Sequence, residues 1–490
     1  MGFRGPQVSV VAHNAQSVLD NPGAARRKVQ REIALGRIAG PFDSPPLPFF
    51  KATPLALREK STPGKFRLLH NLSYPYNEAA VNLNIPEEWT KLAYASIGDA
   101  IRAIAAAPGV FLAKADIAEA YRLLPLHPGC YNLTGFSLDG KFFFDRCLPM
   151  GASSACKTFE RFSDALKFAL AAWYRVSRVI KVLDDFLFLG DSYDECARAL
   201  DSFVTLCAGI GVPLAEDKTV GPVQELVFLG IQLNSRTMIA SIPADKLSRY
   251  RGNLQDALAN HRVPLRALKS AIGKLQFRCL IIPAGRCSLR RPHDATRGPP
   301  IPGRLVSLSA GCRAVLEMWA EFLAAYNGKE IIATRPSVCA STLNLCSDSS
   351  LTGFGATFGR HYLMGRFNER WVAYGIQVLE LYPIFLVLSK FAKESRHHRV
   401  VVRCDNTCVV AALNSLTSRN QVLMRLLRRL VLVLLHHNIS VHAVHVPGRD
   451  NQLWVALSRQ IVPSDLLRQR GFLPDPWPVA PHLDPAYFRL

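Results

Sequence analysis

Short apolar runs that end in charged residues recur along the first half of the chain, and two of them enclose a pair of acids. Residues 179–183 form one run, Asp184 and Asp185 follow it, and residues 186–190 form the next. Apolar runs of this length around two polar residues predict a β-hairpin whose tight turn carries both acids. Adjacent carboxylates repel each other and are costly to bury, so a divalent cation is their natural counter-charge. The alternative is an acidic hairpin tip that faces the solvent.

A second predicted strand also ends at an acid. Residues 111–117 are mostly apolar, and Asp116 stands near the end of the run. In a sheet this carboxylate would converge on Asp184 and Asp185. Three carboxylates on neighbouring strands predict a site for two metal ions, in which one ion activates a primer 3′-hydroxyl and the other holds the incoming triphosphate. Oxygen ligands suit Mg²⁺, with Mn²⁺ as the alternative ion.

Other stretches of the first half predict binding surfaces. Residues 65–72 predict a strand on which Lys65 and Arg67 share one face, either as a triphosphate clamp or as an ordinary solvated face. In residues 148–155, Gly151 and small side chains precede a helical run over 156–168 and would let a base pair approach the backbone closely.

The remaining elements of this half are predicted from periodicity and from Pro and Gly. Residues 1–40 predict a short helical lead, and a Pro-rich loop follows over 40–46. One apolar strand is expected over 227–233, and a basic amphipathic helix over 265–279.

The second half predicts an α/β unit with its own acids. Strands over 343–346 and 400–406 lead into Asp348 and Asp405, and Glu380 lies in a helical stretch over 377–394. Acids at two strand ends and one on a helix form a second candidate metal cluster. The alternative for Glu380 is a buried ion pair with Lys390 or Lys393. A very basic helix over 419–437 and a strand over 439–446 follow.

The net charge of the chain indicates which class of partner it binds. Fifty-nine Lys and Arg against 38 Asp and Glu give a formal net charge of +21. Such an excess favours a polyanionic partner, most often nucleic acid, through phosphate contacts and counterion release. The basic residues are spread along the chain rather than gathered on one amphipathic helix, and no apolar run reaches the length of a membrane span. We therefore expect no membrane partner.

The 12 cysteines show no spacing typical of a disulfide framework. We therefore expect reduced thiols in an intracellular protein, cytoplasmic or nuclear. Cys404 and Cys408, with His442 and His445, are ligand types that zinc accepts. The two histidines are three residues apart in a predicted strand and would point to opposite faces, which argues against zinc.

In this order, the motifs resemble those of a retroelement reverse transcriptase joined to a ribonuclease H domain. The resemblance covers about residues 20–460 and is greatest to the DIRS-like, tyrosine-recombinase class of retrotransposons. Residues 36–42, 67–73 and 81–82 resemble the fingers of that class, residues 116–121 its first palm motif, and residues 148–151 its template and nucleotide motif. The acidic pair, a following lysine at Lys218 and a primer grip at Phe228, Leu229 and Gly230 complete the series.

The resemblance implies an RNA-directed DNA polymerase of the α+β class, with a right-hand arrangement of fingers, palm and thumb, followed by an α/β ribonuclease H-like domain with a mixed sheet. The implied domains are a helical lead over 1–40, fingers and palm over 41–240, a thumb-like helical region over 241–290, a connection over 291–340, a ribonuclease H-like domain over 341–462 and a tail over 463–490. The implied partners are an RNA template, a DNA primer, their hybrid and dNTPs, with an element-encoded recombinase as a further one.

The resemblance also assigns roles to single residues. Asp116, Asp184 and Asp185 would bind two Mg²⁺ ions in the palm, and Asp348, Glu380 and Asp405 would bind two more and direct water onto the RNA strand of a hybrid. The residues implied to contact the nucleotide are Lys65, Arg67, Tyr121, Met150, Gly151 and Lys218. Among these, Tyr121 would be the aromatic gate against a ribose 2′-hydroxyl, and Lys218 would protonate the leaving pyrophosphate. The basic helices over 265–279 and 419–437 would follow the phosphates of the hybrid.

Three positions depart from the family pattern. Val182 stands where an aromatic residue or His is usual, and Met150 where Gln is common, so we expect changed nucleotide handling. Val455 occupies the position of the fourth Asp in the closing motif over 445–459, and valine cannot coordinate Mg²⁺. Polymerase activity is therefore the firmer expectation, and RNA cleavage the weaker. The alternatives are a decayed or host-adopted copy that binds nucleic acid without catalysis, and a ribonuclease H-type hydrolase with an inert palm.

Overall fold

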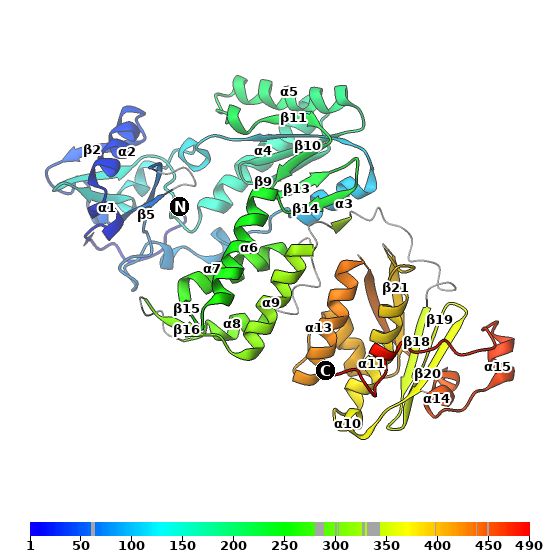
Figure 1. Cartoon of the computed structure of the whole chain (residues 1–490). Helices are drawn as coiled ribbons and strands as arrows, with labels where there is room; N and C mark the ends of the chain where they lie inside the picture. Colours follow the sequence, from blue (N-terminus) through cyan, green and yellow to red (C-terminus); the bar gives the residue numbers. More distant parts are fainter. Residues whose placement is uncertain are drawn as a thin grey trace. The chain divides into compact units, whose positions relative to one another are not determined.

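The computed structural model describes residues 1–59, 64–279, 289–298, 301, 303–325, 329–330, 344–396, 398–437, 439–447 and 450–490. They divide into two compact units, residues 1–100 with 110–229, and residues 101–109 with 230–490 (Figure 1). The mixed α and β content and the mixed sheets confirm the predicted fold class. None of the helices in the described ranges has both the length and the apolar character needed to cross a membrane.

The N-terminal segment of the first unit is built into a five-stranded sheet of order β1-β3-β7-β8-β2. Its strands are β1 (Val10–Val11), β2 (Ile38–Phe42), β3 (Lys51–Ala52), β7 (Gly135–Leu138) and β8 (Lys141–Asp145). A helix in the predicted lead is confirmed, as α2 (Pro22–Ala34). The predicted loop is wrong at its start, because residues 40–42 belong to β2. This strand lies at the edge of the sheet, where Pro41 is tolerated although it lacks an N–H to donate.

Smaller elements complete this part of the first unit. Helix α1 and the hairpin of β4 with β5 pack on the same core as α2, and β5 carries Arg67 as predicted. The bounds of the elements are α1 (Gln16–Leu19), β4 (Leu55–Glu59), β5 (Phe66–His70), η1 (Asn82–Asn84), η2 (Glu87–Trp89), η3 (Ala120–Leu123) and η4 (Pro128–Leu133). Helix α3 (Ile97–Ala106) begins in the first unit, and its residues from 101 onward belong to the second.

A four-stranded sheet of order β11-β6-β10-β9 forms the rest of the first unit. Its strands are β6 (Phe111–Asp116), β9 (Val179–Val182), β10 (Asp185–Gly190) and β11 (Val220–Val223), with η5 (Glu216–Lys218) before β11. Helices α4 (Ala155–Tyr174) and α5 (Tyr193–Gly209) lie beside it (Figure 1). Phe186, Phe188 and Phe203 stack between the sheet and α5, so the strands that carry the acids rest on a packed aromatic core.

Two predicted turns differ in detail from the structure. In the acidic hairpin, Leu183 and Asp184 form the turn, with Leu183 in the left-handed region at φ 55°, and Asp185 already begins β10. The single strand predicted over 227–233 is wrong. It is interrupted by Leu229 and Gly230, both with positive φ, and forms the separate strands β12 (Glu225–Phe228) and β13 (Ile231–Asn234). A continuous apolar run hides such a turn, because its backbone angles leave no mark on hydropathy.

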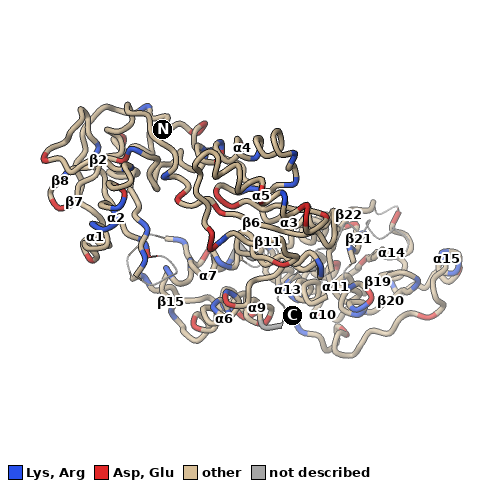
Figure 2. The backbone as a smooth tube through the Cα atoms, turned by 90° about the horizontal axis from the view of Figure 1, so that it is seen from above, with Lys and Arg blue, Asp and Glu red and all other residues tan. Residues whose placement is uncertain are grey.

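The second unit contains a helical region after β13 and β14 (Ile239–Ser241). The predicted helix over 265–279 is confirmed as α7, whose Arg266 and Lys269 are exposed. The elements of this region are α6 (Ala244–Ala259), β15 (Arg262–Pro264), α7 (Leu265–Arg278), α8 (Arg290–Ala295), β16 (Leu305–Ser307), α9 (Ala310–Ala325) and β17 (Lys329–Glu330). Figure 2 shows that Lys and Arg are distributed along the whole chain, as expected from the sequence.

The rest of the second unit is built on a five-stranded mixed sheet of order β20-β19-β18-β21-β22. The predicted strands and the helix with Glu380 are confirmed over the described residues; Leu343, the first residue of one predicted strand, lies outside them. The elements are β18 (Asn344–Ser349), β19 (Gly353–Phe358), β20 (His361–Arg366), α10 (Glu369–Val372), α11 (Ile376–Lys390), β21 (Arg399–Cys404), α12 (Thr407–Ser415), α13 (Gln421–His436), β22 (Ser440–His445), α14 (Gln452–Ser458), α15 (Ser464–Gln469) and η8 (Pro481–Leu483). Near the C-terminus, Phe488 is buried and joins the core around α11.

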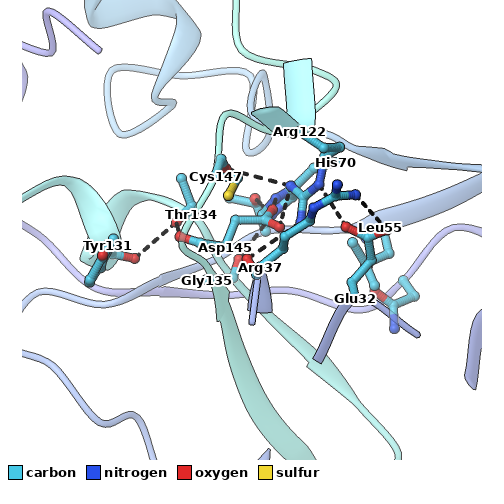
Figure 3. Close-up of polar contacts among 12 residues, drawn as sticks. Glu32, Arg37, Leu55, His70, Arg122, Tyr131, Thr134, Gly135, Asp145 and Cys147 are labelled. Atoms are coloured by element: carbon cyan, nitrogen blue, oxygen red, sulfur yellow. Dashed lines mark hydrogen bonds and ion pairs between the residues drawn. The ribbon is translucent and has the colours of Figure 1, made fainter. Parts of the chain in front are cut away.

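A buried polar network ties the N-terminal segment to β8 and η3 (Figure 3). The Arg122 guanidinium donates to Glu32 Oε2 at 2.8 Å and to Asp145 Oδ1 at 2.7 Å. His70 Nδ1 lies 3.2 Å from the other oxygen of Asp145. Asp145 is 5% exposed, so this pairing forms away from water. Because a buried charge is stable only with its partners, the network requires all of these segments together.

We expect Asp145→Asn to lower the free energy of unfolding of the first unit by about 3 kcal/mol. This is the lower end of the range for breaking a buried pair, because Arg122 keeps Glu32 as a partner. The change is measured by urea unfolding, in which the folded fraction of the first unit is detected by its resistance to proteolysis. Asp139→Asn is the control, because its pair with Arg26 is exposed and should matter little. If the two variants unfold at the same urea concentration, the network does not stabilise the fold.

Candidate active sites

The structure brings the three predicted palm acids together. Strands β6 and β10 pair antiparallel so that Asp116 lies directly opposite Asp185. Asp184 precedes Asp185 in the turn, and its carbonyl oxygen accepts a hydrogen bond from the N–H of Ile117 at 3.0 Å. Asp116 is buried, and the other two acids are half-buried. The register of one strand pair therefore creates the cluster, and the solvent-facing alternative for the hairpin is wrong.

Helix α4 fixes the turn that carries Asp184. The N–H of Leu183 donates to Glu160 Oε2 at 2.9 Å, and Ser163 Oγ donates to the carbonyl oxygen of Leu183 at 2.7 Å. Lys181, in β9, pairs with Glu160 at 2.7 Å and with Asp164 at 2.8 Å while being only 5% exposed. Sequence reasoning missed this support. The available signal was a lysine inside an apolar strand, which needs a buried acid as its partner.

The electrostatics of the cluster favour the binding of a cation. Burial and the charges of Asp184 and Asp116 raise the pKa of Asp185 to about 7. Burial also raises the pKa of Asp184. Lys218 Nζ donates to Asp116 Oδ1 at 2.7 Å, and this contact raises the pKa of the lysine although burial opposes the change. One lysine against three carboxylates leaves a net negative site of oxygen ligands, which suits Mg²⁺.

A cavity of about 560 Å³ adjoins the palm acids. It is lined by Asp116 and Asp184 and by four of the residues predicted to contact the nucleotide, Arg67, Tyr121, Met150 and Lys218. Among the described residues, Lys65 and Gly151 do not line it. Lysine and arginine side chains of α2 that sequence reasoning missed, Lys28 and Arg31, do line it. The cavity therefore combines acids with cations of the kind that bind a triphosphate.

The structure gives a reason for glycine at position 151 that differs from the predicted one. A Cβ at this position would lie 1.8 Å from the carbonyl oxygen of His70, and the residue has φ 142°. The neighbouring Met150 carbonyl accepts from the N–H of His70 at 2.9 Å. Gly151 thus permits contact between two segments of the protein itself. Of the residues predicted to act as a primer grip, Leu229 and Gly230 form a turn and Phe228 is buried beside it.

The second predicted set of acids also comes together. Strands β18 and β21 pair in parallel and carry Asp348 and Asp405 toward the same edge, and Glu380 of α11 is buried nearby. Burial and the two aspartates raise the pKa of Glu380 to about 9, and burial raises that of Asp348 to about 6. The alternative pairing of Glu380 with Lys390 or Lys393 is absent among the described ion pairs, since Lys390 lies over the ring of Trp477.

A cysteine joins this second cluster. Within the described ranges, Glu380, Cys404 and Asp405 are the one group of three whose possible ligand atoms all lie within 4.8 Å of one another. Cys404 Sγ lies 4.0 Å from Glu380 Oε2. Cys408 is exposed, so the zinc set considered from the sequence does not form. No disulfide joins the cysteines that the structure describes.

Helix α14 holds Asp348 from both sides. Asn451 Nδ2 donates to Asp348 Oδ1 at 3.1 Å, and Ser458 Oγ donates to Oδ2 at 2.6 Å. Residues 451, 455 and 458 share one face of a helix by their spacing. Along the chain, Val455 therefore lies between the two residues that contact Asp348.

Comparisons with known proteins agree with this geometry. Residues 59–233 match the family described as reverse transcriptase (RNA-dependent DNA polymerase). No curated protein matches the chain by sequence. The family match assigns residues 59–233 to a reverse transcriptase domain.

Three solved structures of the foamy viral protease-reverse transcriptase are similar in fold, each with a TM-score of 0.53 and 14% identity. The one named dRH, in complex with double-stranded DNA, is matched over 91% of this chain and 73% of its own. The complex with an RNA/DNA hybrid is matched over 90% and 56%, and a further complex with double-stranded DNA over 91% and 86%.

The raised pKa of Asp185 predicts a pH dependence of stability in the absence of metal. Its pKa rises from an ordinary value of 3.8 to about 7, so the folded chain holds a proton there that the unfolded chain releases. The resulting stability is complete below pH 3.8 and is lost as the pH rises through 7. At pH 8 with a chelator, Asp185→Asn should raise the melting temperature of the first unit by about 2–4 °C.

Thermal unfolding between pH 5 and pH 8 measures this effect. Asp201→Asn, an exposed carboxylate of α5, controls for the loss of a negative charge. If the two variants shift the melting temperature equally at pH 8, the burial of Asp185 is not the cause. Added Mg²⁺ should stabilise the wild-type chain more at pH 8 than at pH 5, since the ion binds the ionised carboxylates.

Proposed function

We propose that this chain is the reverse transcriptase of a retroelement, which copies RNA and DNA templates by adding dNTPs to a primer 3′-hydroxyl. The observation that carries the proposal is the pairing of Asp116 opposite Asp185, with Asp184 beside them, at one end of a cavity that also contains cations and an aromatic ring. Its likeness to the DIRS-like class of retrotransposons rests on the order of the sequence motifs.

The residues of the cavity divide the work of phosphoryl transfer. Asp116, Asp184 and Asp185 would hold two Mg²⁺ ions, which supply activation of the primer hydroxyl and neutralisation of the triphosphate. Arg67 and the α2 cations would neutralise the remaining phosphate charge. Lys218, which pairs with Asp116, would give a proton to the leaving pyrophosphate. Tyr121 would form the wall that the sugar of the incoming nucleotide meets.

Nucleic acid would be the principal partner. The similar foamy viral structures hold double-stranded DNA or an RNA/DNA hybrid. In this chain the exposed cations of α7, Arg266 and Lys269, and Arg425 of α13 are available for phosphate contacts. Solvent exposure alone also fits an ordinary helix surface. The assignment of these cations to nucleic-acid contacts is supported by the net charge of +21 together with the reverse transcriptase domain.

We further propose that residues 344–490 form a ribonuclease H-like domain with weakened activity. The support is the convergence of Asp348, Glu380 and Asp405 on a five-stranded mixed sheet. Val455 lacks an oxygen ligand, and both oxygens of Asp348 accept hydrogen bonds from α14. Fewer free oxygens at the cluster would weaken the binding of a second ion.

The first test is extension of a DNA primer on an RNA template with Mg²⁺. We expect extension by the wild-type chain and a loss of at least about a thousandfold for Asp185→Asn, since the variant removes a metal ligand. Glu380→Gln is the matched control, because it neutralises a buried acid of the other cluster and should extend normally. A folded wild-type chain that binds hybrid without extending primers would instead support the non-catalytic alternative.

A gain of function tests the second cluster. Val455→Asp places a carboxylate beside Asp348, so cleavage of the RNA strand of a hybrid should rise by about ten- to a hundredfold, the range associated with groups that tune metal affinity. Gln452→Asp adds the same charge on an exposed position of α14 and is the control. Should both variants cleave equally, or neither more than the wild type, Val455 does not limit the reaction.

A further inference from the structure

Tyr121 is held in the wall of the nucleotide cavity by a thiol. Its hydroxyl and Cys156 Sγ share a hydrogen bond of 3.2 Å. The ring lies edge-on to Phe159, with centroids 5.7 Å apart, and is half-buried. Burial and Cys156 both raise the pKa of Tyr121, so the phenol stays neutral. The ring is therefore restrained at its polar end by Cys156 and along its side by Phe159.

A second tyrosine lies near the same sulfur. Burial and the neighbouring Cys156 raise the pKa of Tyr94 to about 12. Tyr94 is 43% exposed, whereas Cys156 is half-buried. The thiol thus stands between two neutral phenols, one in the cavity wall and one toward solvent.

Cys156 belongs to the helix that also positions a catalytic acid. It lies in the first turn of α4, one turn before Glu160, which accepts from the N–H of Leu183 in the acidic turn. The same helix therefore fixes Asp184 through Glu160 and Tyr121 through Cys156. Because both contacts come from one rigid element, the distance between the cavity wall and the acids is set by α4.

We propose that Cys156 is a positioning residue that sets the selectivity of the polymerase for deoxyribonucleotides by holding the Tyr121 ring in place. The inference rests on the proposed function and deepens it. A restrained ring leaves a fixed space for the sugar of the incoming nucleotide, whereas a ring that can tilt leaves room for an additional hydroxyl. Cys156 itself does not line the cavity among the described residues, so it acts through Tyr121.

The experiment compares kcat/KM for dATP and ATP on one primer–template. In Cys156→Ala we expect the preference for dATP to fall about three- to tenfold, the change that the loss of one hydrogen bond produces. Cys156→Ser should restore it, because a hydroxyl replaces the thiol as a partner. Tyr121→Phe should lose the same preference, and adding Cys156→Ala to it should change little more. Cys130→Ala, a half-buried cysteine of η4, is the control.

The outcomes separate this inference from the proposed function. If the wild type extends primers with dATP but the preference is unchanged in Cys156→Ala, the inference is wrong and the polymerase stands. If the wild type does not extend primers, the proposed function is wrong, and the same variants are compared by equilibrium binding of dATP and ATP with Ca²⁺. An unchanged ratio of affinities there overturns the role of Cys156 as well. A loss of preference in Cys156→Ser equal to that in Cys156→Ala indicates a packing effect and also overturns it.

Discussion

The repulsion among Asp116, Asp184 and Asp185 is the constraint on which the first unit depends. Strand pairing places these carboxylates within reach of one another, and burial makes their charges costly. Nothing in β6 or β10 relieves that cost. The surrounding structure offsets this electrostatic cost. Lys218 pairs with Asp116, and the buried pair of Lys181 and Glu160 supports the turn. The aromatic core under β10 keeps the strands from separating.

The two acidic clusters meet this constraint in different ways. In the first, a lysine and the cavity cations offset the acids and leave the carboxylates open toward a large space. In the second, Asn451 and Ser458 satisfy Asp348 with neutral donors, and Cys404 adds a polarizable group near Glu380. These donors favour the ionised form of Asp348, but burial still raises its pKa to about 6, and burial with the two neighbouring aspartates raises the pKa of Glu380 to about 9. The same residue types therefore form one site whose carboxylates are open to cations and one whose carboxylate oxygens are partly occupied by hydrogen bonds.

The sequence was sufficient where chemistry and periodicity coincide. The strands that end in Asp116 and Asp184, the helix with Glu380 and the basic helix α7 all follow from local patterns. What it could not supply depends on contacts between distant segments. Gly151 was assigned to a ligand, but its neighbour is His70. Lys28 and Arg31 had no role assigned from the sequence, and they line the cavity because α2 lies beside it. Residues 40–42 pair with β8, about 100 residues later, and no local signal announces such a partner.

The network around Arg122 has a consequence for the order in which the chain acquires its structure during synthesis. Glu32 and Arg37 leave the ribosome long before Arg122 and Asp145 have been made. Until then, β2 lacks its neighbour and the N-terminal segment has unpaired charges and an open strand edge. Contacts of such long sequence separation form slowly. The nascent first unit would therefore spend the time needed to translate about 100 residues as a client for holding chaperones, and its completion would begin only when β8 emerges.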